Sequence, residues 1–138
     1  MTRRRTIAVP RAQARLHLAK ARQFLEEAEA AALARRHDAA MLNAVHAGIA
    51  AADAVSVALA GRRSAGQDHA AAIDLLEEAG RDYDEARIRA QQLSALISKK
   101  NLSAYESRRV RAGEAVDAVK RATRLVTWAE DLVPKVGR

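Results

Sequence analysis

The chain lacks several residue types on which many functional sites depend. It has no cysteine among its 138 residues, which excludes disulfide bonds, thiolate catalysis and zinc sites with cysteine ligands. Aromatic residues make up 3% of the sequence, and there are six glycines and two prolines. This composition favours helices over strands wherever it is patterned, and the lack of cysteine is typical of a cytoplasmic protein.

Long hydrophobic runs are also scarce. Only the segment 39–60 approaches the length and apolarity of a membrane span, and it contains Asn43, His46 and Asp53 among many alanines. We interpret this segment as the core helix of a protein that does not enter a membrane.

The start of the chain is basic. Arg3, Arg4 and Arg5 are not followed by an apolar stretch, so this region is not a signal peptide. We predict that residues 1–9 form a disordered basic tail. The remaining residues, 10–138, have the length of a single domain with one core.

What the sequence does have is alanine, which makes up about a quarter of the residues and recurs with other apolar residues at helical spacing. No alternation of period two is visible, so strands are not predicted. We predict an all-α fold, an antiparallel bundle of about five helices.

The ends of the helices are also indicated by single residues. Asp38 is the expected N-cap of the second helix, Gly61 its C-terminal cap residue and Pro134 the end of the last helix. Asp117 and Arg121 are spaced to form an ion pair on that last helix. The predicted helical segments are 10–36, 38–60, 68–79, 83–97 with a short stretch around Tyr105, and 112–133.

A polar stripe interrupts the most apolar helix. The segment 41–60 is apolar on nearly every side, which predicts a buried central helix. At about 100° per residue, Asn43, His46 and Asp53 lie within roughly 80° of one another. An unpaired buried polar group costs about 1 to 3 kcal/mol, so the stripe must face partners, water or a ligand. We expect Asp53 to hydrogen-bond His46 or His69 and so to hold a polar pocket between the second and third helices. Alternatively, these groups satisfy one another within the bundle or across a dimer contact.

The net charge of +7 would attract a phosphate polymer. Basic residues gather on the last helix and just before it: Lys99, Lys100, Arg108, Arg109, Arg111, Lys120, Arg121 and Arg124. Acidic residues interleave with them, so an ordinary solvated face stands as the alternative to a nucleic-acid groove. The motifs of phosphate-binding loops, dinucleotide-binding folds, serine hydrolases and zinc proteases are missing, and the residues predict no metal or other cofactor.

Two stretches resemble the HEPN superfamily, the higher-eukaryote and prokaryote nucleotide-binding helical domains. The first is Ala-Ala-Asp53-Ala-Val-Ser-Val-Ala-Leu-Ala-Gly61, followed after a loop by His69-Ala-Ala-Ala-Ile-Asp-Leu-Leu. In such proteins the second helix ends near a glycine, and a histidine opens the third helix before a Leu-Leu pair. The second stretch is Lys100-Asn-Leu-Ser-Ala-Tyr105, which precedes a long last helix. The resemblance covers about 11–133 and extends to the helical domain of kanamycin nucleotidyltransferases.

The resemblance implies a homodimeric bundle, often encoded beside a nucleotidyltransferase in toxin–antitoxin pairs. Our leading hypothesis is a non-catalytic module that binds a nucleotide, a nucleic acid or a protein such as that nucleotidyltransferase. The candidate ligand-binding residues are Asn43, His46, Asp53, His69 and Tyr105. A purely structural helical dimer, in which the polar stripe sets the register of the interface, is one alternative.

The other alternative is an RNase toxin. Active members of the superfamily cleave RNA without a metal, using an arginine and a later histidine that are separated by four to six residues. Arg63 and His69 have this spacing, and Arg62 lies beside them. Arg11 and His17 match as well, although chance alone produces about two such pairs in a chain with 19 arginines and four histidines. We predict little or no metal-independent RNA cleavage, because an arginine on a glycine-flanked loop is hard to hold in place.

Overall fold

The structure is a computed structural model of the 138-residue chain. It describes residues 6–65, 69–106 and 108–136, with side chains described in these ranges outside 100–107.

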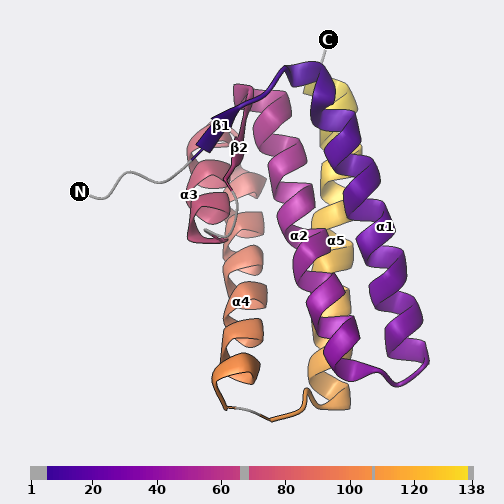
Figure 1. Ribbon diagram of the computed structural model, residues 1–138. Helices are drawn as coiled ribbons and strands as arrows, with labels where there is room; N and C mark the ends of the chain where they lie inside the picture. Colours follow the sequence, from indigo (N-terminus) through magenta and orange to yellow (C-terminus); the bar gives the residue numbers. More distant parts are fainter. Residues whose placement is uncertain (1–5, 66–68, 107, 137–138) are drawn as a thin grey trace.

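Five α-helices dominate the described residues (Figure 1). Their bounds are α1 Ala14–Leu33, α2 His37–Ala60, α3 His69–Ala79, α4 Asp84–Glu106 and α5 Ala112–Val136, and a 3-10 turn, η1 at Arg11–Gln13, precedes α1. The predicted all-α class and helical bundle are confirmed. The four long helices run side by side, and the shorter α3 lies beside a small sheet at one end of the bundle (Figure 1).

Helix α2 is the central element, because it packs against all the other helices. Most of its side chains are buried, as its all-round apolar pattern predicts. Gly48 allows a close approach here: a Cβ atom at this position would lie 3.0 Å from a methyl carbon of Leu96. By length and composition α2 could cross a membrane, but 72% of its apolar window is buried inside the bundle, as in the core helix of a soluble protein.

A two-stranded sheet was not predicted. Strand β1, Thr6–Ala8, pairs antiparallel with strand β2, Arg62–Ser64, so that Thr6 lies opposite Ser64. The expectation of a disordered tail over 1–9 is therefore wrong for β1, whereas residues 1–5 lie outside the described part. Three-residue strands are too short to show a period of two, and their partners are distant in the sequence.

Helix ends also depart from the sequence-based bounds. Asp38 lies in the first turn of α2 and Arg36 is the N-cap residue, whereas Gly61 follows α2 in the predicted left-handed conformation, with φ 67°. The expected break near residues 98–101 and the separate helix around Tyr105 are both absent, because α4 continues through them without a glycine or proline to stop it. Pro134 lies inside α5, two residues from its end, where little helix remains to be disrupted.

Candidate functional site

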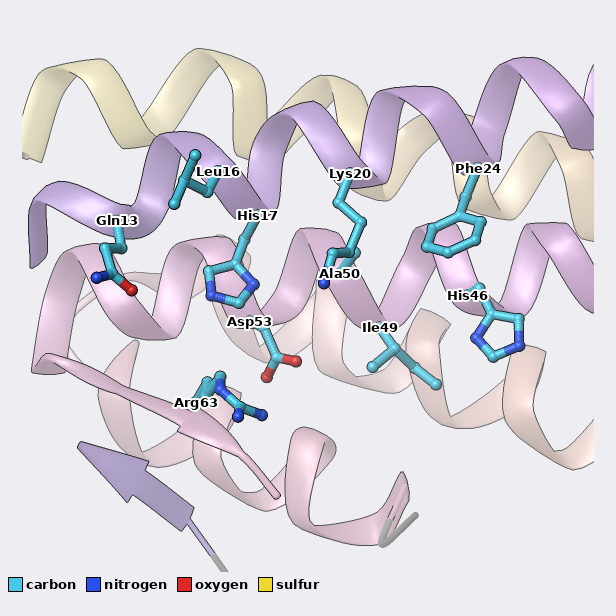
Figure 2. A pocket seen from close by; sticks show the side chains of 10 residues that line it. All are labelled: Gln13, Leu16, His17, Lys20, Phe24, His46, Ile49, Ala50, Asp53 and Arg63. Atoms are coloured by element: carbon cyan, nitrogen blue, oxygen red, sulfur yellow. The ribbon is translucent and has the colours of Figure 1, made fainter. Parts of the chain in front are cut away.

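A cavity of about 510 Å³ opens along the face shared by α1, α2 and β2. Figure 2 shows the side chains around it, with His17, Asp53 and Arg63 pointing toward one another. The residues that line the cavity are Gln13, Leu16, His17, Lys20, Phe24, His46, Ile49, Ala50, Asp53 and Arg63. The end of the cavity near Asp53 is therefore basic and polar, and the end near Phe24 is largely apolar.

The antiparallel packing of α1 against α2 brings these residues together. The two helices are joined by a short turn at which Arg35 adopts a left-handed conformation, with φ 61°. Residues at equal distances from this turn face each other, so His17 lies near Asp53 and Phe24 lies against His46. Seven residues separate His17 from Phe24 along α1 and His46 from Asp53 along α2, a rise of roughly 10 Å between the two pairs. The cavity therefore has two ends of different chemistry.

Asp53 is the buried carboxylate at the polar end, and its residue is 8% exposed. Its Oδ1 atom accepts hydrogen bonds from the Ser64 backbone amide at 2.9 Å and from the Ser64 hydroxyl at 2.8 Å. Burial raises the pKa of Asp53, while the bonds from Ser64, followed by the charges of His17 and Arg63, act against this rise. The predicted hydrogen bond of Asp53 to His46 or His69 is wrong: the partner is Ser64, held in place by strand β2.

His17 was not among the predicted site residues. Burial lowers its pKa, Asp53 acts to raise it, and Lys20 and Arg63 lower it further. A lowered pKa favours the neutral imidazole near pH 7, which has one donor and one acceptor nitrogen. The sequence does hold one signal that could have identified His17. It lies as many residues before the predicted turn between the first two helices as Asp53 lies after it, so antiparallel packing of these helices places the two residues near each other.

The apolar end is formed by a pair of rings. Phe24 of α1 and His46 of α2 stack with their ring centroids 5.3 Å apart and their planes at 30°. Ile49 extends this surface toward the polar end. Such a surface can receive a flat apolar group against its edge.

Only part of the predicted polar stripe on α2 lines the cavity. His46 and Asp53 line the cavity, but Asn43 does not, and its amide nitrogen donates to the backbone oxygen of Ala39 at 2.9 Å. This bond satisfies the Asn43 amide within its own helix, so Asn43 needs no partner from another element. His69 is the first residue of α3 and is not part of the cavity wall.

The other predicted site residues lie in different places. Arg63 lines the cavity, and its Nη1 donates to the backbone oxygen of Ser64 at 3.0 Å. Arg62 is exposed on the same strand, and its guanidinium donates to the Thr6 hydroxyl. The side chain of Tyr105 lies outside the described part of the structure. Within that part, no three histidine, aspartate or glutamate side chains gather as a metal site would require.

Several basic residues of the last helix region are paired with acids. Arg108 donates to both carboxylate oxygens of Glu114, at 2.7 and 2.8 Å, and this contact lowers the pKa of Glu114 to about 2. Arg121 donates to Asp117 at 2.9 Å, as predicted from their spacing. Around Arg108 and Arg121, these pairs favour an ordinary solvated face over a groove for nucleic acid.

The chain was also compared with models of protein families, with curated proteins and with solved structures, and none of the three comparisons found a match.

Proposed function

We propose that the protein is a non-catalytic module that binds a nucleotide, or another small ligand with a phosphate group, in the cavity between α1, α2 and β2. The observation that carries this proposal is the meeting of His17, Lys20 and Arg63 at one end of a cavity whose other end is a ring pair. The resemblance to HEPN domains points to the same class of ligand.

The basic end suits a phosphate group. Arg63 and Lys20 supply two positive charges beside the single carboxylate of Asp53. An arginine can bind two phosphate oxygens at once, and lysine acts as a point charge. His17 adds a donor, and a bound phosphate would favour its protonated form.

The rest of the cavity suits the other parts of a nucleotide. Both bonds from Ser64 reach Oδ1 of Asp53, so Oδ2 can accept a hydrogen bond from a ligand hydroxyl group. Phe24 and His46 lie roughly 10 Å further along the helices and offer their surface to a base. A cavity of about 510 Å³ is within the usual range for small-molecule sites.

The experiment is a calorimetric titration of the purified protein with ATP and, separately, with adenosine. We expect ATP to bind and adenosine to bind much more weakly, because adenosine lacks the phosphates. Arg63→Ala should weaken ATP binding by roughly 10-fold to 100-fold, the effect of losing about 1.5 to 3 kcal/mol of charged hydrogen bonding. Lys20→Ala should act in the same direction.

Arg62→Ala is the matched control, because Arg62 neighbours Arg63 on β2 but lies outside the cavity wall. It should leave ATP binding unchanged. The proposal is wrong if ATP does not bind at millimolar concentration, or if Arg62→Ala weakens binding as much as Arg63→Ala.

A second candidate function is RNA cleavage, and one observation changes which histidine is the candidate for it. The histidine that shares a cavity with Arg63 is His17, not His69. RNA cleavage needs a histidine to move protons beside a cation that stabilises the phosphorane. We still expect little or no metal-independent cleavage, because the nearby carboxylate of Asp53 opposes the build-up of negative charge. RNA cleavage in EDTA that His17→Ala abolishes, with the fold intact, would replace the leading proposal.

The homodimer and the nucleotidyltransferase partner stay predictions. Large apolar side chains are exposed along the first two helices, with Leu16 66% exposed and Leu33 87% exposed. Light scattering over micromolar concentrations tests the dimer. A stable dimer that binds no ATP would favour the purely structural alternative.

A further inference from the structure

A second cavity, of about 410 Å³, lies at the opposite end of the bundle from the small sheet. Two turns meet there, the one between α1 and α2 and the one between α4 and α5 (Figure 1). The wall of this cavity includes Arg35, Arg36, His37, Asp38, Arg109 and Val110. The proposed nucleotide cavity uses none of these residues.

Asp38 holds the two turns together. Its Oδ1 atom accepts a hydrogen bond from the backbone amide of Val110 at 3.0 Å. Its Oδ2 atom lies 3.8 Å from Nε of Arg109. Val110 is buried, so the α4–α5 turn is anchored while the Arg109 side chain stays exposed. The position of the cavity is therefore fixed by the fold.

The charge balance of this cavity is positive. Three guanidinium groups, of Arg35, Arg36 and Arg109, face one carboxylate, that of Asp38. Arg35 and Arg36 are exposed, and in the described part of the structure their side chains have no hydrogen bond or ion pair. Arg108 is close in sequence but is already paired with Glu114. The unpaired arginines are therefore available to an external anion.

Two backbone and side-chain features also favour an anion. Helix α2 begins at this cavity, and its N-cap residue Arg36 makes no side-chain hydrogen bond to the first amides of the helix. Such open amides, at the positive end of the helix dipole, attract phosphate oxygens. In addition, Nδ1 of His37 is shielded from solvent and has no hydrogen-bond partner among the described residues. Buried polar atoms in folded proteins nearly always have a partner.

We propose that this second cavity binds backbone phosphates of a nucleic acid without reading its bases. The arginines lie open on the surface, which suits contact with a long polyanion better than enclosure of a small ligand. Apart from His37, the described wall has no aromatic ring on which a base could stack. The contacts therefore position the polymer and carry no sequence preference.

The test is fluorescence anisotropy with a labelled single-stranded RNA and with a DNA duplex, at several salt concentrations between about 50 and 200 mM. The variant Arg36→Ala/Arg109→Ala removes two charges from the cavity and keeps Arg35, whose positive φ disfavours alanine. We expect the affinity for nucleic acid to fall on the order of tenfold. The slope of the logarithm of the binding constant against the logarithm of the salt concentration should become shallower by roughly 0.7 to 0.9 for each lost phosphate contact. RNAs of different sequence should bind alike.

The charge-matched control is Arg81→Ala/Arg87→Ala, two exposed arginines that lie around a different cavity. It should change affinity by less than about twofold. Equal losses in both double variants, or no binding of either polymer by the wild type, would overturn the proposal. The proposal would also fail if inorganic phosphate binds the cavity while the Arg36→Ala/Arg109→Ala variant retains full affinity for RNA. Arg63→Ala should weaken ATP binding and leave RNA binding intact, which separates failure of this site from failure of the nucleotide site.

Discussion

The two cavities lie toward opposite ends of the same pair of helices and differ in how they are built. At the sheet end, Asp53 of α2 is buried and held by Ser64, and the charged groups around it come from two other elements, α1 and β2. At the turn end, the cations are exposed, and two of them are adjacent in the sequence. The first cavity depends on the packing of the whole bundle, whereas the second depends on two turns joined by Asp38.

This difference has an energetic consequence. A buried carboxylate with two hydrogen bonds contributes to folding, and its removal leaves donors without partners. An exposed arginine contributes little to folding, so its removal should change the free energy of unfolding little. Substitutions at the sheet end should therefore change stability, and substitutions at the turn end should change binding with little effect on stability.

The largest effect is expected for Asp53→Ala. The buried amide and hydroxyl of Ser64 lose their acceptor, which should lower the free energy of unfolding by about 3 kcal/mol. Urea denaturation followed by circular dichroism measures this loss. Asp53→Asn keeps an acceptor oxygen and should lose only about 1 kcal/mol. A loss below about 0.5 kcal/mol for the alanine variant would show that the bonds to Ser64 do not stabilise the fold.

A smaller effect is expected in the pH dependence of stability. The pKa of folded His17 lies below its ordinary value of 6.5, so below that pH the unfolded chain binds more protons than the folded one. The stability contribution of His17 is therefore present above pH 6.5 and is lost as the pH falls through the lowered pKa. His17→Gln should remove this loss, as measured by urea denaturation at a series of pH values.

Asp53 is the control for the sign of that effect. Its pKa is raised from 3.8, so its contribution is full below that pH and is lost as the pH rises through the raised value. Asp53→Asn should remove this opposite dependence. If wild type and His17→Gln lose stability in parallel between about pH 7 and pH 5, His17 does not have a lowered pKa in the folded protein.

The smallest effect is expected at the turn end. Arg35 has a φ of 61°, a conformation that glycine adopts without cost, so Arg35→Gly should stabilise the fold by about 0.5 to 1 kcal/mol. Arg36→Gly is the matched control, because Arg36 has a φ of −94° and should gain nothing. Urea denaturation compares the two variants. A destabilised Arg35→Gly would show that the Arg35 side chain supports the turn.

Much of the fold follows from local patterns in the sequence. Helical spacing identifies the bundle and the buried α2, and the spacing of Asp117 and Arg121 identifies their ion pair. Gly61 marks the left-handed residue after α2 because a positive φ favours glycine. Each of these features depends on a pattern within one continuous segment of the chain, so the sequence alone determines it.

The tertiary structure decided the rest. Nothing local in the sequence pairs β1 with β2, and it is this pairing that places Ser64 and Arg63 beside Asp53. His17 and Asp53 are 36 residues apart and meet only because α1 packs antiparallel on α2. A side chain's partner across a bundle depends on helix register and on strand pairing, which arise when the whole chain buries its apolar surface together. The sequence therefore determined which side chains were present, and packing determined which of them met.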